Sequence, residues 1–230
     1  MNEKLRELSA RLGHSFADES LLETAVMHRS WISENEGYKS NERLEFLGDA
    51  VLGWVVADIV YQRHADLAEG KLTDLRKSVV NATALAQVAD ELDVGECLLL
   101  GRGEASGGGS HKTSILSDAL EAIIGAVYLD AGAVVAYEVV GALLSASIDD
   151  AVENIDRLDA KTRLQEMTSR LFDAAPHYVI SDSGPDHDKT FVAAVVVNGR
   201  ELGTGQGRSK KAAEQIAAEI ACDILEGEHN

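Results

Sequence analysis

Residues 42–50 of the chain read ERLEFLGDA, and the spacing of their charges guides the interpretation of the whole sequence. On a helix, Glu45 and Asp49 are four residues apart and share one face, with Glu42 one turn earlier. The stretch continues as an apolar run through Val56, so we expect this helix to be largely buried. Buried carboxylates repel one another and are costly to desolvate. Proton uptake, a basic partner or a divalent metal would each relieve that cost.

A second acidic stretch repeats this pattern. Asp118 and Glu121 are three residues apart inside the apolar segment 115–127, so they also share a helix face. An acidic pair on a helix usually marks a solvated face, but the neighbours here are apolar. If the two helices pack with these faces together, four carboxylates converge. Such a cluster of hard oxygen ligands suits Mg²⁺ or Mn²⁺, and carboxylate-bound Mg²⁺ commonly acts on phosphodiesters.

The composition limits the classes of protein to be considered. The chain has 230 residues, 45% of them hydrophobic, which is enough for one large or two modest domains. There is no run of 18 apolar residues, so we expect no membrane span, and residues 1–8 are too charged for a signal peptide. The two cysteines, Cys97 and Cys222, lie in apolar contexts. They exclude a disulfide framework and a cysteine zinc site, and they predict a cytoplasmic location.

The net charge of −18 is the main objection to a nucleic-acid-binding function. The excess is concentrated in residues 1–158, which carry 13 Lys and Arg against 27 Asp and Glu. Residues 159–230 carry 8 against 12, a net charge of −4. Any contact with phosphate must therefore come from local basic patches.

The proline content and the spacing of apolar residues change near residue 158. Before it, proline is absent and apolar residues recur at helical spacing. We expect helices near residues 3–12, 20–28, 41–64, 71–92, 113–130 and 133–150, the last two separated by Gly132. The glycine-rich residues 101–110 predict a flexible loop, either a plain connector or a substrate contact.

The C-terminal segment predicts the order α-β-β-β-α. A helix is expected at 161–173, strands at 178–180, 190–197 and 200–207, and a second helix at 209–226. Asn198-Gly199 is a hairpin signal, and Ser209 is a suitable N-cap for the closing helix.

With these elements in place, the sequence resembles bacterial ribonuclease III. The resemblance is collinear and lies in five elements: residues 27–31, 41–50, 114–122, 159–166 and 205–214. It implies an all-α endonuclease domain over residues 1–149, a linker over 150–158 and an α+β double-stranded-RNA-binding domain over 159–228. It further implies a homodimer that hydrolyses double-stranded RNA with Mg²⁺, for which Mn²⁺ can substitute. The products would carry 5′-phosphate and 3′-hydroxyl ends, and the expected roles are the processing of rRNA precursors and mRNA.

The family motif also implies roles for individual residues. The expected metal ligands are Glu45, Asp49, Asp118 and Glu121, of which Asp49 and Glu121 would also be catalytic. Phe46 matches a dimer-interface position, with ordinary core packing as the alternative. Glu42 would pair with a basic side chain, contact RNA or contact the partner subunit. The number of metal ions per cleavage remains open.

In the binding domain, the resemblance assigns contacts with RNA to three elements. Lys210 and Lys211 would meet phosphates at a helix N-terminus, unless they form only a solvated helix start. Gln165 and Glu166 would meet one minor groove, and His187 the other.

Two other functions fit parts of the pattern. One is a non-catalytic double-stranded-RNA-binding regulator, which requires loss of acidic ligands, whereas all four are present here. The other is a helical phosphohydrolase that acts on nucleotides. The module at residues 159–228 argues against it, because a small substrate has no groove to read.

Overall fold

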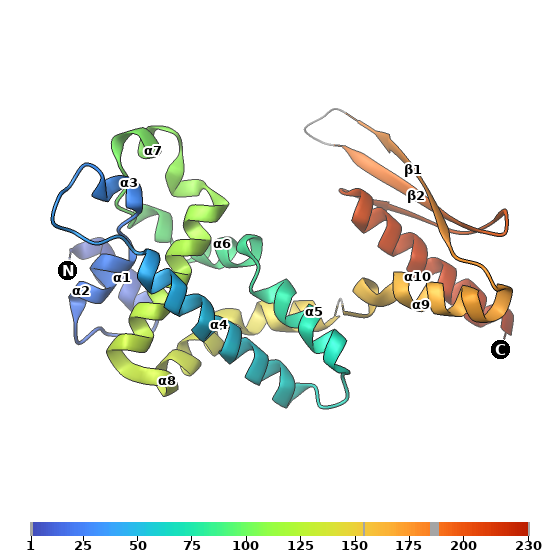
Figure 1. Cartoon of the computed structure of the whole chain (residues 1–230), viewed down its shortest axis with the longest axis horizontal. Helices are drawn as coiled ribbons and strands as arrows, with labels where there is room; N and C mark the ends of the chain where they lie inside the picture. The colour runs from blue at the N-terminus through green and yellow to red at the C-terminus, as the bar shows by residue number, and fades with distance from the viewer. Residues whose placement is uncertain (1, 154, 185–188, 230) are drawn as a thin grey trace. The chain divides into compact units, whose positions relative to one another are not determined.

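The computed structural model describes residues 2–153, 155–184 and 189–229, and these form two compact units, Met1–Ala151 and Val152–Asn230 (Figure 1). The first unit is helical, as predicted. Its elements are α1 Glu3–Arg11, α2 Glu19–Ala25, α3 Arg29–Ile32, α4 Glu42–Arg63, α5 Glu69–Val79, α6 Ala82–Glu91, η1 Val94–Glu96, α7 Arg102–Ser106, η2 Gly109–His111 and α8 Thr113–Glu153.

The structure corrects three expectations for this unit. The single helix expected at 71–92 is two helices, because Asn81 ends the first and caps the second through bonds to the amides of Thr83 and Ala84. The short α3 was not predicted. The glycine-rich residues 101–110, expected as a flexible loop, contain α7 and most of η2. The predicted break at Gly132 is confirmed by its non-helical φ of 79° and ψ of −175° inside α8.

The helices α4 and α8 cross in direct backbone contact, as Figure 1 shows near the middle of the unit. A Cβ added to Gly48 would lie 1.7 Å from the carbonyl oxygen of Glu121. A Cβ added to Gly125 would lie 2.3 Å from the carbonyl oxygen of Leu44. Only glycine fits at either position, so the sequence of both helices is adapted to this crossing.

By length and composition, α8 alone among the described helices would be able to cross a membrane. However, Ile123, Ile124 and Val127 on this helix are fully buried in the core of the helical unit. Its apolar character is therefore explained by packing.

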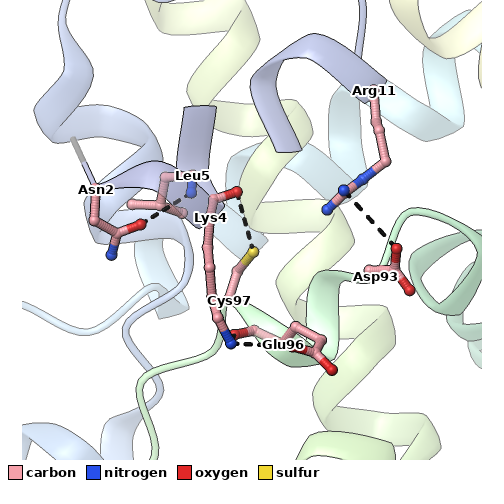
Figure 2. A network of polar contacts seen from close by, with 7 residues as sticks. All are labelled: Asn2, Lys4, Leu5, Arg11, Asp93, Glu96 and Cys97. Atoms are coloured by element: carbon pink, nitrogen blue, oxygen red, sulfur yellow. Dashed lines mark hydrogen bonds and ion pairs between the residues drawn. The ribbon is translucent and has the colours of Figure 1, made fainter. Parts of the chain in front are cut away.

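A polar network attaches α1 to η1 (Figure 2). The Nζ of Lys4 lies 3.1 Å from the carbonyl oxygen and 3.0 Å from a carboxylate oxygen of Glu96. The guanidinium of Arg11 lies 3.8 Å from Asp93, and the Cys97 thiol lies 3.7 Å from the carbonyl oxygen of Lys4. Each exposed ion pair contributes little by itself, so the network chiefly fixes the position of α1.

The second unit has the predicted order α-β-β-β-α. Its elements are α9 Ile155–Phe172, β1 His177–Ser183, β2 Thr190–Val197, β3 Arg200–Gly207 and α10 Lys210–His229. The strands form an antiparallel sheet in the order β1-β2-β3. Both residues of the predicted Asn198-Gly199 turn have positive φ, as a tight hairpin turn requires.

The predicted linker 150–158 is helical where the structure describes its backbone, because α8 extends to Glu153 and α9 begins at Ile155. The expected domain boundaries stay a prediction. Within the second unit, the helices cover one face of the sheet. Gly203 and Gly205 allow α10 to approach β3, because a Cβ on either would lie 2.6 Å or less from a carbonyl oxygen of α10.

We expect Gly48→Ala to lower the free energy of unfolding of the helical unit by about 3 kcal/mol, because the new methyl group must push two backbones apart. Both tryptophans, Trp31 and Trp54, lie in this unit, so urea denaturation followed by tryptophan fluorescence reports on it alone. Gly53→Ala is the matched control on α4. Nothing lies within 4 Å of its added Cβ, so stability should rise by about 0.5–1 kcal/mol. Equal effects of the two substitutions would contradict the close crossing.

Candidate functional site

Three acidic side chains converge where α4 and α8 cross. Glu45, Asp118 and Glu121 each offer a carboxylate oxygen, and these oxygens all lie within 4.8 Å of one another. All three side chains are partly buried. The backbone contact at Gly48 involves the carbonyl of Glu121 itself, so the crossing places the acidic groups directly.

The donor set of this cluster fits a hard divalent cation. Oxygen ligands lie at about 2.1 Å from Mg²⁺, so ligands on opposite sides of the ion are about 4.2 Å apart. The three carboxylate oxygens are at most 4.8 Å apart, so small side-chain rotations would bring them to this distance. Carboxylates are also the ligand type that Mg²⁺ and Mn²⁺ prefer.

The electrostatics of the cluster are unfavourable without a cation. Burial, and then the charges of Asp49, Asp118 and Glu45, raise the pKa of Glu121 to about 7. Burial, and then the charge of Asp118 followed by those of Glu42 and Asp49, raise the pKa of Glu45 above its ordinary value. Glu121 therefore takes up a proton near neutral pH when no cation balances the cluster.

The fourth expected ligand, Asp49, lies close enough to act on both pKa values but stands outside the group of three oxygens. Its side chain is exposed, one turn after Glu45 on α4. The structure thus brings together three of the expected ligands and places the fourth at the exposed side of the cluster.

Glu42, at the first turn of α4, has contacts of its own. Its carboxylate accepts a hydrogen bond of 2.6 Å from the hydroxyl of Ser40 and lies 3.7 Å from the guanidinium of Arg29. A basic partner is one of the three roles that the sequence left open for this residue.

Phe46 points away from the core of its own chain. The side chain is 81% exposed, so core packing does not explain it. It borders an open hollow of ≈ 680 Å³ whose apolar lining includes Leu47 and Leu129. Leu129, on α8, was not singled out in the sequence, because its place beside Phe46 depends on the tertiary packing.

In the second unit, two of the predicted RNA-contacting elements are open to solvent. Gln165 and Glu166 are exposed on α9, and Lys210 and Lys211 are exposed in the first turn of α10. The predicted N-cap is confirmed, because the hydroxyl of Ser209 accepts a hydrogen bond from the amide of Ala212 at 3.1 Å. His187 lies outside the described residues.

Glu214, one turn after Lys210 and Lys211 on α10, is held within its own unit. Its carboxylate accepts a hydrogen bond of 2.5 Å from the Nζ of Lys161, which also lies 4.6 Å from the centre of the Tyr178 ring. Glu214 therefore has an internal partner that joins α10 to α9.

Comparisons with known proteins agree with this geometry. Residues 18–148 match the family model described as Ribonuclease-III-like, and residues 160–225 match the double-stranded RNA binding motif. Ribonuclease 3 of Thermobifida fusca is 52% identical over 218 residues, which cover 95% of this chain and 90% of that protein. Ribonuclease 3 of Streptomyces coelicolor is 51% identical over 214 residues, which cover 93% of this chain and 77% of that protein.

Solved structures show the same relationship. A nuclease domain of ribonuclease III from Campylobacter jejuni is 42% identical, with a TM-score of 0.59. The matched region covers 62% of this chain and 96% of that domain. That structure was described for flexibility in a region involved in dimer formation. Since both family models match and relatives near 50% identity span almost the whole length, the chain belongs to the ribonuclease III family of double-strand-specific endoribonucleases.

Proposed function

We propose that the acidic cluster is the metal centre of this endoribonuclease, with Glu45, Asp49, Asp118 and Glu121 as ligands of Mg²⁺ or, in its place, Mn²⁺. The convergence of three carboxylate oxygens within 4.8 Å carries this proposal. Bound there, a divalent cation lowers the pKa of a coordinated water and stabilises the leaving oxygen.

Asp49 and Glu121 are the catalytic carboxylates in this proposal. A water oxygen forms the new bond to phosphorus while the bond from phosphorus to the 3′ oxygen breaks. The phosphate stays on the 5′ end of one product, and the 3′ oxygen of the other takes up a proton. Glu121, with a pKa of about 7, is able to exchange a proton near neutral pH, and the side chain of Asp49 is exposed to solvent.

The binding domain supplies the preference for a duplex. Lys210 and Lys211, exposed at the N-terminus of α10, meet phosphates with support from the helix dipole. Gln165 and Glu166 face one minor groove, and His187, which lies outside the described residues, is assigned to the other.

A homodimer explains the exposed Phe46. One chain carries one acidic cluster, whereas a duplex needs two cuts to be severed. Two-fold symmetry is the commonest form of closed oligomer, and it matches the approximate symmetry of an RNA duplex. The ring of Phe46 in each chain then packs against the hollow beside Leu47 and Leu129 of the partner chain.

In the cell, we place the enzyme in the cytoplasm, where it processes rRNA precursors and mRNA. Two buried free cysteines fit a reducing compartment. A non-catalytic regulator is disfavoured, because all four of the proposed metal ligands are present in the sequence.

Glu121→Gln is expected to abolish cleavage of long double-stranded RNA in Mg²⁺ and to leave duplex binding in chelator unchanged. The same change should stabilise the metal-free protein at pH 8 by about 1–2 kcal/mol after allowance for solvent screening. Below about pH 4.5, the carboxyl of Glu121 is protonated in both the folded and the unfolded chain, so it does not lower the free energy of unfolding. Above about pH 7, it is ionised in both, and the buried charge lowers the free energy of unfolding by its full amount. The stabilisation should therefore shrink as pH falls from 8 to 4.

Urea denaturation in chelator, followed by tryptophan fluorescence, measures this difference. The matched control is Glu138→Gln, an exposed position on the same helix, which should alter neither cleavage nor stability appreciably. Full cleavage by a folded Glu121→Gln protein would refute its assignment.

Lys210→Ala combined with Lys211→Ala is expected to weaken duplex binding and to reduce the slope of log affinity against log salt by about 2, because two phosphate contacts are lost. Filter binding across a salt titration in chelator measures both quantities. Lys71→Ala with Lys77→Ala on α5 makes the same charge change in the other domain and should leave the slope unchanged. An unaltered slope in the first variant would reject the contact at α10.

Phe46→Asp should convert the dimer to a monomer and abolish double-strand cleavage at the same time. Burial of the ring across the interface contributes about 1.5–3 kcal/mol per subunit. Light scattering should then report one chain mass of 24.6 kDa in place of two. Val179→Asp on β1, where the native side chain is 53% exposed, is the control and should remain dimeric. A fully active monomer would contradict the proposed interface.

A further inference from the structure

Asn41 stands at the start of α4, yet its side chain does not cap the helix. Asparagine is among the commonest N-cap residues, but this one makes no side-chain cap bond and is only 3% exposed. Its Nδ2 instead donates to the carbonyl of Ala25 at 3.2 Å, and its amide donates to the carbonyl of Met27 at 2.9 Å. Its own carbonyl accepts from the amides of Leu44 and Glu45 at 2.8 and 2.9 Å. One residue therefore connects the backbone of an acidic ligand to the segment before α3.

The same segment also holds residues 99–101, which come directly before α7. The amide of Leu99 donates to the carbonyl of Val26 at 2.9 Å, and the amide of His28 donates to the carbonyl of Leu99 at 3.1 Å. The amide of Gly101 donates to the hydroxyl of Ser30 at 2.9 Å. A Cβ added to Gly101 would lie 2.5 Å from the carbonyl oxygen of Ser30, so the two backbones touch. Residues 25–30 thus form a junction between residues 99–101 and the start of α4.

This junction attaches the start of α4 at a point apart from its crossing with α8. The crossing extends from Leu44 to Gly48 on α4, so it holds the backbone on both sides of Glu45. The junction adds a bond to Glu45 itself, because the carbonyl oxygen of Asn41 accepts a hydrogen bond from the Glu45 amide. Loss of the anchor at Asn41 would release the first turn of α4, which carries Glu45.

We propose that Asn41 is a positioning residue that holds Glu45 at ligand distance from Asp118 and Glu121. Ser30 supports the same junction from its other side, through its bond to the amide of Gly101. This role rests on the proposed metal site, because it concerns the geometry of its ligands. Supporting groups of this kind typically change metal affinity by about 10-fold to 100-fold when they are removed.

Binding of Mn²⁺ to the full-length, RNA-free protein tests this role without reference to activity. The electron paramagnetic resonance signal of free Mn²⁺ gives the dissociation constant directly. Asn41→Ser is the informative variant, because serine suits a helix start as well as asparagine does but is too short to reach Ala25. We expect its dissociation constant for Mn²⁺ to rise about 10-fold, with unchanged duplex-RNA affinity in chelator.

The matched control is Asn81→Ser. Asn81 is a true N-cap of α6, with bonds to the amides of Thr83 and Ala84. Serine should preserve this cap, so the dissociation constant for Mn²⁺ should not change. Wild-type Mn²⁺ affinity in Asn41→Ser would overturn the proposal. A lower melting temperature with an unchanged dissociation constant for the folded fraction would also overturn it, because that result describes a purely structural residue.

A second pair of variants tests the other side of the junction and serves alone if Asn41→Ser does not fold. Ser30→Ala removes the acceptor for the amide of Gly101 and should weaken Mn²⁺ binding. Ser33→Ala removes a hydroxyl bond that stays within the same turn, to the carbonyl of Ser30, and should not. Equal Mn²⁺ affinities in this pair would refute the junction.

Glu121→Gln separates a failure of this role from a failure of the metal site. If Glu121→Gln binds Mn²⁺ as tightly as the wild type, the proposed metal centre is wrong and the role of Asn41 falls with it. If Glu121→Gln weakens binding while both junction variants match the wild type, the metal site stands and only the positioning role is rejected.

Discussion

The direct contact of α4 and α8 at Gly48 and Gly125 is the constraint on which the rest of the helical unit depends. Side chains usually keep packed helices about 8–10 Å apart. Here the carbonyl oxygen of Glu121 occupies the place that a Cβ of residue 48 would take. Without that approach, the carboxylates of Glu45 and Glu121 would not reach a common ion. Glycine in a helix costs about 1 kcal/mol relative to alanine, so the contact is maintained at the expense of helix stability.

The acidic cluster also lowers the stability of the folded chain, here through the burial and mutual repulsion of like charges. Burial and like charge raise the pKa of Glu121 to about 7, so the metal-free site is relieved by a proton. A cation that binds there must displace this proton, and metal affinity therefore depends on pH near neutrality. Within the part of the chain that the structure describes, no basic group lowers the pKa of Glu45 or Glu121, so the cluster is suited to a bound cation.

The sequence predicts those features that depend on local chemistry. The break at Gly132, the Asn198-Gly199 turn and the Ser209 cap are confirmed, because each follows from spacing or from the conformational preference of one or two residues. Of the four carboxylates expected to converge, three lie together. The errors have a tertiary origin. Apolar spacing continues across Asn81, so the pattern predicts one helix where the structure has α5 and α6. The glycines of residues 101–110 indicate flexibility, but only glycine fits at position 101, because the backbone of Ser30 leaves no room for a Cβ. The side-chain direction of Asn41 likewise depends on a segment sixteen residues earlier in the chain.

The net charge of −18 no longer opposes binding of RNA once the charges are placed in the structure. Lys210 and Lys211 are exposed together at a helix N-terminus, whereas Glu214 on the same helix is engaged with Lys161. In the helical unit, the acidic groups that would repel a phosphate most strongly are those that converge on one cation site. A phosphate beside the uncompensated cluster would meet several like charges, but a bound divalent cation reverses the sign of that interaction. In the proposed metal centre, the ion that supplies the chemistry would therefore also make the acidic cluster attractive to RNA, which would couple productive binding of the substrate to loading of the metal.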